Sequence, residues 1–263
     1  MTEKFTNIRA KKSLGQNFLI DESALYDIAH SVPVWGKNIV EVGPWYGALT
    51  DYLIEQDPET LTLVELDTDM IDILNSRFQI QDSKFTIIHQ DVLQFAPNFL
   101  EYSVIANIPY YITSPILFHF LYSEDFVPPE SMVIMMQEEV WEKILEWRHP
   151  KKPHHSLLSL AMEEACEDID IVRYVPRTSF DPAPKVDSIV LRFVVRKSRD
   201  RKQEQSLIWL WKVAFAHPRK TFLSNMKGSA YDVGNIRTIL LELGYDERIR
   251  SEAIRREDWK RFL

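Results

Sequence analysis

Short apolar, strand-like segments alternate with helical patterns over residues 38–147. The expected strands are 38–42, 60–64, 85–88, 102–106 and 131–136, and the expected helices are 48–54, 70–78, 114–121 and a segment running to about 147. Strands separated by helices pair in parallel, because a helical crossover returns the chain to the same edge of the sheet. The alternation therefore predicts an α/β fold, in which a parallel sheet carries helices on both faces.

The rest of the chain continues this body and then changes character. The remaining expected elements of the body are helices at 21–31 and 156–166 and strands at 169–175 and 187–195. Residues 197–205 are polar and highly charged, as in a linker, and the apolar residues beyond them recur at helical spacing. We therefore expect two domains, an α/β domain over 1–196 and a small all-helical domain over 205–263.

Composition narrows the classes of protein that the chain can be. Its 263 residues, 45% of them hydrophobic, are enough for one large core and one small core. The single cysteine, Cys166, excludes an internal disulfide framework and a Cys-based zinc site. No window is apolar enough to cross a bilayer, and residues 1–12 lack the apolar stretch of a signal peptide. We therefore expect a cytoplasmic protein without membrane association.

Basic residues are concentrated in one segment. The net charge is -8, yet residues 192–227 contain ten Lys or Arg against two acids. Residues 1–191 contain 14 basic and 30 acidic residues, and 228–263 contain seven of each. A basic segment beside an acidic body is often only a solvated face, but it also suits local contact with a nucleic acid.

A loop with the sequence Asn-Ile-Pro-Tyr follows the strand expected at 102–106. Asn107 and a backbone carbonyl can accept hydrogen bonds from an amino group, Pro109 stiffens the loop, and Tyr110 can stack on a planar ring. Such a set can hold a nucleobase. The alternative is a strand-to-helix turn with a buried tyrosine.

Three other expected strands also end in suitable groups. Gly43 follows the first strand, Glu65 closes the second, and Asp91 with Val92 follows the third. In doubly wound sheets, ligands bind at such strand ends. Glu65 can accept from ribose hydroxyls and Asp91 from an adenine amino group, while Val92 offers its backbone N–H. The G-x-G-x-x-G pyrophosphate motif is absent, so we prefer S-adenosylmethionine to NAD as the nucleoside.

Several motifs occur in order along nearly the whole chain. They are Lys12–Leu19, Glu41–Pro44, Val64–Asp67, Gln90–Val92, Asn107–Ile112, Phe180–Ser188, and Ala214–Phe215 with Arg219–Thr221. In these motifs the chain resembles the rRNA adenine dimethyltransferases, which modify two adjacent adenosines near the 3′ end of small-subunit rRNA. The resemblance implies a Rossmann-like class I methyltransferase sheet and a small C-terminal helical domain.

The resemblance also implies roles for individual residues. Gln16, Asn17 and Leu19 would close over S-adenosylmethionine, and Gly43 would lie under its methionine part. Glu65 would bind the ribose and Asp91 the adenine, and Asn107 would lie between the cofactor and the target base. The roles of Glu65, Asp91 and Asn107 agree with those reached from the strand ends.

The expected chemistry is methyl transfer to the exocyclic N6 of adenine. The Asn107 side-chain oxygen and the carbonyl of Ile108 or Pro109 would accept hydrogen bonds from this amino group, which aims its lone pair at the methyl. Tyr110 would stack on one face of the base and Phe180 on the other. We expect no general base, because the product ammonium can lose its proton to water.

The expected partner is 16S-type rRNA within a pre-ribosomal particle, bound by a monomer. The candidate RNA contacts are Lys11 and Lys12 in the arm, Lys151 and Lys152 in a basic loop, and Arg219 and Lys220 in the tail. His154 and His155 lack Cys or carboxylate partners in the sequence nearby, so we expect no metal site.

Trp45 departs from the family pattern, which has glycine at this position. An indole there is expected to crowd the methionine part of the cofactor, because glycine lets the backbone approach a ligand. The alternatives are an indole turned outward or a glycine miscoded as tryptophan. Two other functions also stay open: a macrolide-resistance methyltransferase acting on large-subunit rRNA, and a non-catalytic ribosome-assembly factor whose pocket Trp45 blocks.

Overall fold

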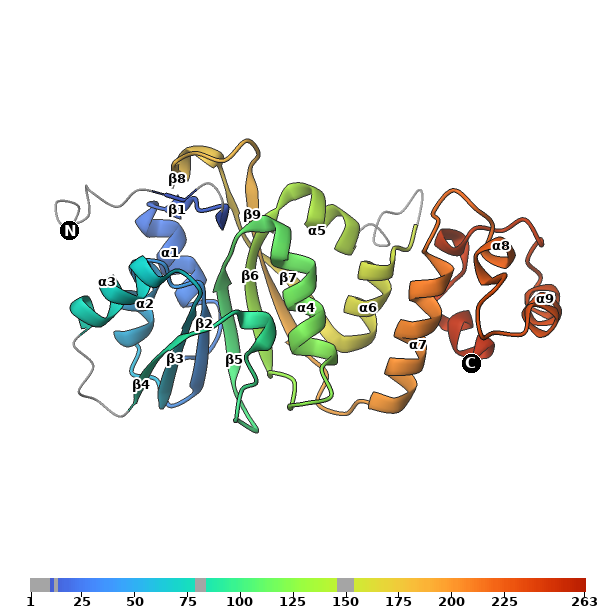
Figure 1. Cartoon of the computed structure of the whole chain (residues 1–263), viewed down its shortest axis with the longest axis horizontal. Coiled ribbons are helices and arrows are strands. Elements are labelled where there is room, and N and C mark those ends of the chain that lie inside the picture. Colours follow the sequence, from blue (N-terminus) through green and yellow to red (C-terminus); the bar gives the residue numbers. More distant parts are fainter. Residues whose placement is uncertain (1–9, 12–13, 79–83, 146–153) are drawn as a thin grey trace. The chain divides into compact units, whose positions relative to one another are not determined.

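A computed structural model describes residues 10–11, 14–78, 84–145 and 154–263. Within these residues, seven strands form one sheet in the order β4-β3-β2-β5-β6-β9-β7 (Figure 1). The strands are β2 (Asn38–Val42), β3 (Thr60–Glu65), β4 (Phe85–His89), β5 (Ser103–Asn107), β6 (Ser131–Gln137), β7 (Cys166–Val175) and β9 (Ser188–Val195). The predicted α/β sheet is confirmed.

The first five strands pair in parallel, as the alternation predicts. The chain moves outward from β2 to β3 and β4, and then returns to lay β5 and β6 on the other side of β2. The strand order therefore reverses between β2 and β5, which is the position where doubly wound sheets bind ligands. Gly43 directly follows β2 and Asn107 ends β5, so the two meet at this reversal.

The parallel pairing predicted for residues 38–147 does not extend to β9. This strand runs antiparallel to β6, with Ser131 paired to Val194 and Gln137 paired to Ser188. No helical crossover separates β9 from β7, so its direction is free of the constraint that makes crossover-linked strands parallel.

Helices cover the sheet on both faces. They are α1 (Glu22–Ala29), α2 (Ala48–Ile54), α3 (Thr68–Phe78) and α4 (Thr113–Tyr122). Alternate strand residues such as Ile39, Leu63 and Ile105 share one core cluster with α1, α2 and α3. The intervening residues are also buried, and α4 lies over the face turned to the viewer in Figure 1. Burial of both faces explains why these strands read as continuous apolar runs.

The turn between β2 and α2 depends on two glycines. Gly43 has φ +66°, and a Cβ there would lie 3.1 Å from the backbone oxygen of Asn107. Gly47 has φ +87°, and a Cβ there would lie 2.5 Å from the ring of Phe78. Both positions need the left-handed backbone that glycine adopts readily, and both bring neighbouring segments into close contact.

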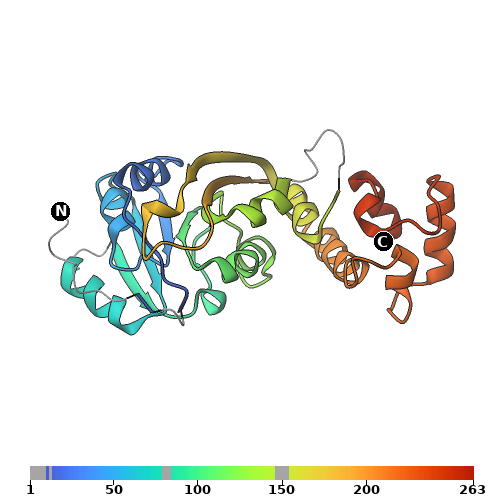
Figure 2. The same ribbon diagram turned by 90° about the horizontal axis from the view of Figure 1, so that it is seen from above.

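A second, two-stranded sheet joins distant parts of the chain. β1 (Phe18–Leu19) pairs antiparallel with β8 (Phe180–Asp181), so Leu19 lies beside Phe180. Figures 1 and 2 show these segments side by side above the main sheet. Neither strand was predicted from the sequence, because two residues are too few to give a periodic pattern.

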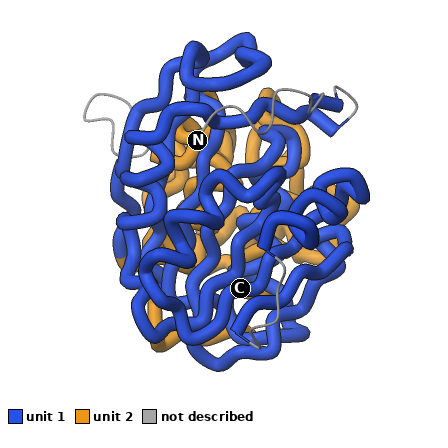
Figure 3. The backbone as a smooth tube through the Cα atoms, turned by 90° about the vertical axis from the view of Figure 1, so that its left-hand side faces the viewer, with its two compact units in different colours: residues 1–138, 168–195 blue, residues 139–167, 196–263 orange. Residues whose placement is uncertain are grey.

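The chain divides into two compact units, which Figure 3 colours separately. Unit 1 comprises residues 1–138 and 168–195, and unit 2 comprises 139–167 and 196–263. The domain boundary predicted near residue 196 lies close to the point where the chain enters unit 2. Residues 139–167 were expected in the first domain, whereas in the structure they group with the C-terminal helices.

Unit 2 is helical in its described part. Its helices are α5 (Glu138–Leu145, whose first residue belongs to unit 1), α6 (Leu157–Ala165), α7 (Arg201–Ala214), α8 (Phe222–Met226) and α9 (Val233–Glu242). A 3₁₀ segment, Arg256–Phe262, follows them. Trp211, Phe222, Trp259 and Phe262 form an aromatic core, with ring pairs 5.2–6.4 Å apart. The expected linker 197–205 is wrong in part, because α7 begins inside it at Arg201. No helix in the described part of the chain is long and apolar enough to cross a membrane.

Candidate active site

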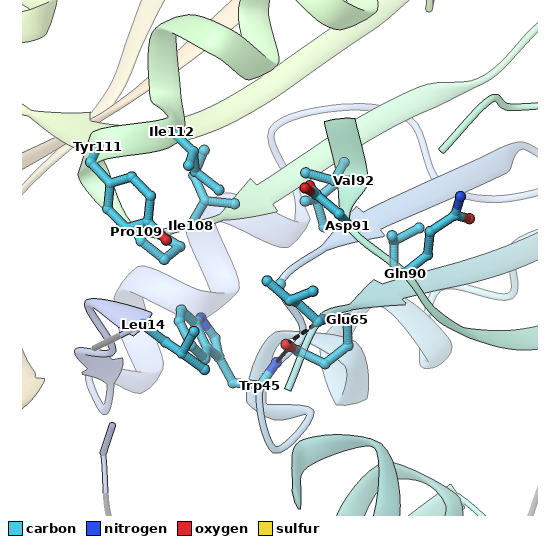
Figure 4. Close-up of a pocket in the computed structure, with 14 residues that line it drawn as sticks. Leu14, Trp45, Glu65, Gln90, Asp91, Val92, Ile108, Pro109, Tyr111 and Ile112 are labelled. Atoms are coloured by element: carbon cyan, nitrogen blue, oxygen red, sulfur yellow. Dashed lines mark hydrogen bonds between the residues drawn. The ribbon is translucent and has the colours of Figure 1, made fainter. Parts of the chain in front are cut away.

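Three hollows meet at the carboxyl ends of β2, β3 and β5. The outer hollow, shown in Figure 4, encloses about 490 Å³ including space open to solvent. It is lined by Leu14, Val42, Gly43, Trp45, Val64, Glu65, Leu66, Gln90, Asp91, Val92, Ile108, Pro109, Tyr111 and Ile112. Of the residues predicted to bind the cofactor, Gly43, Glu65, Asp91 and Val92 therefore lie together at one cavity.

Glu65 is held in one orientation by backbone N–H groups. Its Oε1 accepts hydrogen bonds from the N–H groups of Leu66 and Asp67, both at 2.8 Å, and its Oε2 accepts one from Trp45 at 3.2 Å. Burial raises the pKa of the Glu65 carboxyl, while these backbone hydrogen bonds oppose the rise. A carboxylate fixed at a cavity wall, with one acceptor site left on Oε2, can accept from a ribose hydroxyl.

Asp91 and Val92 lie across the outer hollow from Trp45 and Leu14 (Figure 4). Oδ1 of Asp91 accepts the N–H of Leu93 at 2.9 Å and begins the short 3₁₀ helix Val92–Gln94. This hydrogen bond fixes the Asp91 side chain and leaves Oδ2 as a further acceptor. The arrangement suits the edge of a purine, which presents both donors and acceptors.

The side hollow lies on the other side of the Asn107 loop. It encloses about 180 Å³ including solvent-open space, and its lining consists of Gly15, Asn17, Trp45, Asn107, Ile108, Tyr110, Met135 and Phe180. The structure thus brings together Asn107, Tyr110 and Phe180, the residues that the sequence analysis assigned to the target base. The roles of these residues stay predictions.

Tyr110 is anchored by its hydroxyl group. The hydroxyl is 2.7 Å from Oγ of Ser188 on β9, at hydrogen-bond distance. Burial raises the pKa of Tyr110, so the phenol is neutral at neutral pH. Pro109 precedes the one-turn 3₁₀ helix Tyr110–Ile112, and its carbonyl accepts the N–H of Ile112 at 3.2 Å. This bond helps fix the loop that carries the Tyr110 ring.

The inner hollow lies beneath the turn after β2. It encloses about 240 Å³ including solvent-open space, and its lining consists of Phe18, Leu19, Leu25, Glu41, Gly43, Pro44, Trp45, Tyr46, Ala48, Leu49 and Asn107. Leu19, predicted to close over the cofactor, lines this hollow. Glu41 is buried here, and Thr50 donates a hydrogen bond to its Oε2 at 2.7 Å.

Gln16 faces a carboxylate and does not line the outer hollow. Its Nε2 donates to Oδ2 of Asp67 at 2.8 Å, and its Oε1 accepts the N–H of Lys11 at 2.7 Å. These bonds hold the N-terminal arm against the start of α3. Direct contact of Gln16 with the cofactor stays a prediction, and the bonds support a role in positioning the arm. Asn17 lines the side hollow.

Apolar residues of the outer hollow were missed in the sequence analysis. They are the aliphatic residues Leu14, Leu66 and Ile112, together with the ring of Tyr111. Aliphatic side chains in loops have no distinctive chemistry, so little in the sequence separates them from ordinary core residues. Leu66 gives the one usable signal, because it directly follows the strand-end acid; in the structure its side chain is half exposed. Such residues can cover the flat faces of a purine.

The candidate RNA contacts have different surroundings. Arg219 and Lys220 are exposed in the turn between α7 and α8. Lys11 is paired with Asp67 at 2.5 Å and Asp69 at 2.7 Å, which offsets its charge. Lys12, Lys151 and Lys152 lie outside the described residues. No group of three or more His, Cys, Asp or Glu side chains arranged for a metal occurs among the residues that are described.

Trp45 is the least expected feature of this region. Its backbone is left-handed, with φ +56°, and its side chain is only 7% exposed. The alternative of an indole turned outward is therefore wrong. The indole N–H donates to the backbone oxygen of Asn107 at 2.7 Å, so the ring extends from the end of β2 to the end of β5.

Sequence comparisons identify the relatives of the chain. Residues 7–259 match the family model described as ribosomal RNA adenine dimethylase. The chain is 36% identical over 254 residues to ribosomal RNA small subunit methyltransferase A of Mycoplasmopsis pulmonis, with 96% of this chain and 97% of that protein covered. It is 34% identical over 265 residues to the protein of the same name from Lactococcus lactis, with 95% and 87% covered.

Solved structures confirm the Rossmann-like methyltransferase fold. A dimethyladenosine transferase from Plasmodium falciparum matches with a TM-score of 0.75 at 21% identity, covering 94% of this chain and 96% of that one. The 23S rRNA methyltransferase ErmE matches with a TM-score of 0.68 at 22% identity, covering 94% and 98%. At these identities the likeness concerns the fold alone.

Proposed function

The chain belongs to the ribosomal RNA adenine dimethylase family, and we propose that it dimethylates N6 of two adjacent adenosines near the 3′ end of small-subunit rRNA. The observation that carries this proposal is the convergence of Glu65, Asp91 and Asn107 on adjoining hollows at one edge of the sheet. A donor nucleoside and an acceptor base need such neighbouring sites.

S-adenosylmethionine fits the outer hollow as the methyl donor. After the carboxylate of Glu65 has accepted three backbone N–H groups, one lone pair on its Oε2 stays free for a ribose hydroxyl, and Asp91 with Val92 can bind the adenine edge. Leu66 and Ile108 can cover the faces of the adenine. When bound, S-adenosylmethionine supplies a methyl group on a sulfonium, which is a strong leaving group.

We assign the acceptor adenine to the side hollow, because Asn107, Tyr110 and Phe180 line it together. The Asn107 side-chain oxygen accepts one hydrogen of the N6 amino group, and a loop carbonyl accepts the other. Ile108 is the better source of that carbonyl, because the oxygen of Pro109 already accepts the N–H of Ile112. Tyr110 and Phe180 hold the ring by stacking, which is sufficient to orient the lone pair of the nitrogen toward the methyl. The proton leaves afterwards to water.

The relatives favour the small ribosomal subunit as the substrate. The curated proteins at 34–36% identity are named as small-subunit methyltransferases, whereas the 23S-directed ErmE is only 22% identical. We therefore prefer 16S-type rRNA within a pre-ribosomal particle to large-subunit rRNA. The protein acts in the cytoplasm as a monomer, with the basic turn at Arg219 and Lys220 contacting the RNA backbone.

A substitution at Asn107 tests the proposal. Asn107→Ala is expected to lower methyl transfer to unmethylated small subunits by at least about a hundredfold while sparing RNA binding, because it removes an acceptor that orients the nitrogen. Asn38→Ala is the matched control, since Asn38 lies at the opposite end of β2 and donates to the carbonyl of Glu101 at 3.0 Å. Mapping of the modified bases identifies the substrate. Full activity of Asn107→Ala, or methylation confined to large subunits, would contradict the proposal.

A further inference from the structure

Trp45 lies where the three hollows meet. Of the residues that the structure describes, it alone lines the outer, inner and side hollows. Gly43 is shared by the outer and inner hollows only, Ile108 by the outer and side hollows, and Asn107 by the inner and side hollows. The indole is therefore a partition between the hollow for the donor nucleoside and the hollow for the acceptor base.

Contacts on several sides hold the indole in this position. Its N–H donates to the Asn107 carbonyl at 2.7 Å, and the ring of Phe18 meets it edge to face with centroids 5.7 Å apart. The backbone N–H of Trp45 donates to Glu65 at 3.2 Å. A tryptophan with φ +56° is unusual, because a side chain disfavours this region, so the surrounding contacts must impose it.

The indole N–H also occupies the backbone oxygen of Asn107, which could otherwise accept a hydrogen bond from the ammonium group of the methyl donor. The amino-acid end of S-adenosylmethionine carries an ammonium group, which must be met by oxygen atoms when it leaves water. Asn107 lines both the inner and the side hollow. Its backbone oxygen lies close to Gly43, because a Cβ built at Gly43 would be 3.1 Å from this oxygen. In the observed arrangement this oxygen is bonded to the indole.

We propose that Trp45 is a gate between the donor and acceptor sites. In the free protein the indole fills the passage and caps the Asn107 carbonyl. When the donor binds, the indole turns away, the passage opens, and the carbonyl becomes available to the donor's ammonium group. This inference rests on the proposed function, because it assumes that the outer hollow takes S-adenosylmethionine.

A gate of this kind lowers the apparent affinity for the donor. Apparent affinity falls in proportion to the fraction of molecules in the open arrangement, so an indole that is closed nine times in ten weakens binding about tenfold. Trp45→Gly removes the gate and also suits the left-handed backbone. We therefore expect Trp45→Gly to bind S-adenosylhomocysteine at least about tenfold more tightly than the wild type. Trp45→Phe, which keeps a ring but has no N–H, should lie between them.

Calorimetry with S-adenosylhomocysteine measures these affinities without any need for methyl transfer. Trp35→Gly is the matched control, because Trp35 is 79% exposed and precedes β2 at the opposite end of the sheet. Tryptophan fluorescence provides a second measurement. Ligand binding should change the emission of the wild type and of Trp35→Phe, and this change should be much smaller in Trp45→Phe. Circular dichroism verifies that each variant is folded.

The outcomes separate the gate from the proposed function. Tighter binding by Trp45→Gly together with a Trp45-dependent fluorescence change supports the gate. Equal affinity of wild type and Trp45→Gly overturns the gate and leaves the proposed function intact. Binding by Trp45→Gly but none by the wild type at millimolar ligand also overturns it, since the indole would then be a permanent block. Binding by neither protein overturns both the gate and the donor site.

Discussion

Glu41 is a carboxyl group enclosed in the core of unit 1. Burial raises its pKa to about 8, although a hydrogen bond from Thr50 opposes the rise. Its other oxygen, Oε1, is buried and has no hydrogen-bond partner among the residues that the structure describes. The folded protein therefore holds a proton on Glu41 near neutral pH, whereas the unfolded chain releases it near pH 4.5.

Glu41 should consequently make stability depend on pH. A pKa that is raised on folding leaves stability intact below about pH 4.5 and lowers it as the pH rises toward about 8. Glu41→Gln removes this titration, so the variant should gain stability relative to the wild type by up to about 1.4 kcal/mol per pH unit across this window. Urea unfolding of both proteins at several pH values measures the difference. A difference that stays constant with pH would show that Glu41 is not buried as a neutral acid.

At the scale of a single element, helix α7 has a buried ion pair at its start. Arg199 donates from Nε and Nη2 to the two carboxylate oxygens of Glu204, at 2.8 and 2.7 Å. The two side chains are only 3% and 4% exposed. Asp200 lies between them in sequence and caps the helix by accepting the N–H of Gln203 at 3.1 Å. Charges that predicted a solvated linker therefore form part of a folded helix.

Removing one partner of this pair should be costly. Arg199→Met leaves the Glu204 carboxylate buried without its partner and is expected to lower the free energy of unfolding by about 3–5 kcal/mol. Lys143→Met is the matched control, because it breaks an exposed pair with Glu139 and should cost less than about 1 kcal/mol. The double variant Arg199→Met with Glu204→Leu should recover much of the loss. Denaturant unfolding measures these free energies. Equal losses in Arg199→Met and Lys143→Met would contradict a stabilising buried pair.

At the scale of the whole molecule, the acidic body and the basic segment 192–227 have opposite charges. Under the proposed function this segment binds RNA and releases counterions from the phosphates, so the affinity for RNA is expected to fall as the salt concentration rises. The double variant Arg219→Ala with Lys220→Ala should reduce the slope of log affinity against log salt by about 1.5, because two phosphate contacts are lost. Filter binding from about 50 to about 300 mM salt measures this slope.

The control for this measurement comes from the balanced part of unit 2. Arg237→Ala with Arg248→Ala removes the same charge from residues 228–263, where seven basic residues face seven acidic ones. If both double variants change the slope equally, the overall positive charge of unit 2 accounts for the salt dependence, and the turn at Arg219 has no specific role in RNA binding.

The sequence by itself determined the parts of the fold that depend on local pattern. The strand ends at Val42, Glu65 and Asn107 could be found because apolar runs and helical spacing are properties of neighbouring residues. Once parallel pairing is inferred, these ends must meet at one edge of the sheet. The residue pattern alone was therefore sufficient to select Glu65, Asp91 and Asn107 as candidate site residues, and the structure places them at adjoining hollows.

Only the tertiary structure decided the contacts between distant segments. These are the antiparallel pairing of β9, the β1–β8 pair, the inclusion of 139–167 in unit 2, and the burial of Arg199 with Glu204. The orientation of Trp45 belongs with them. The sequence marked this residue as an obstacle, but its direction depends on the Asn107 carbonyl, 62 residues away. Packing of the folded chain sets that geometry, which the local pattern around residue 45 does not contain.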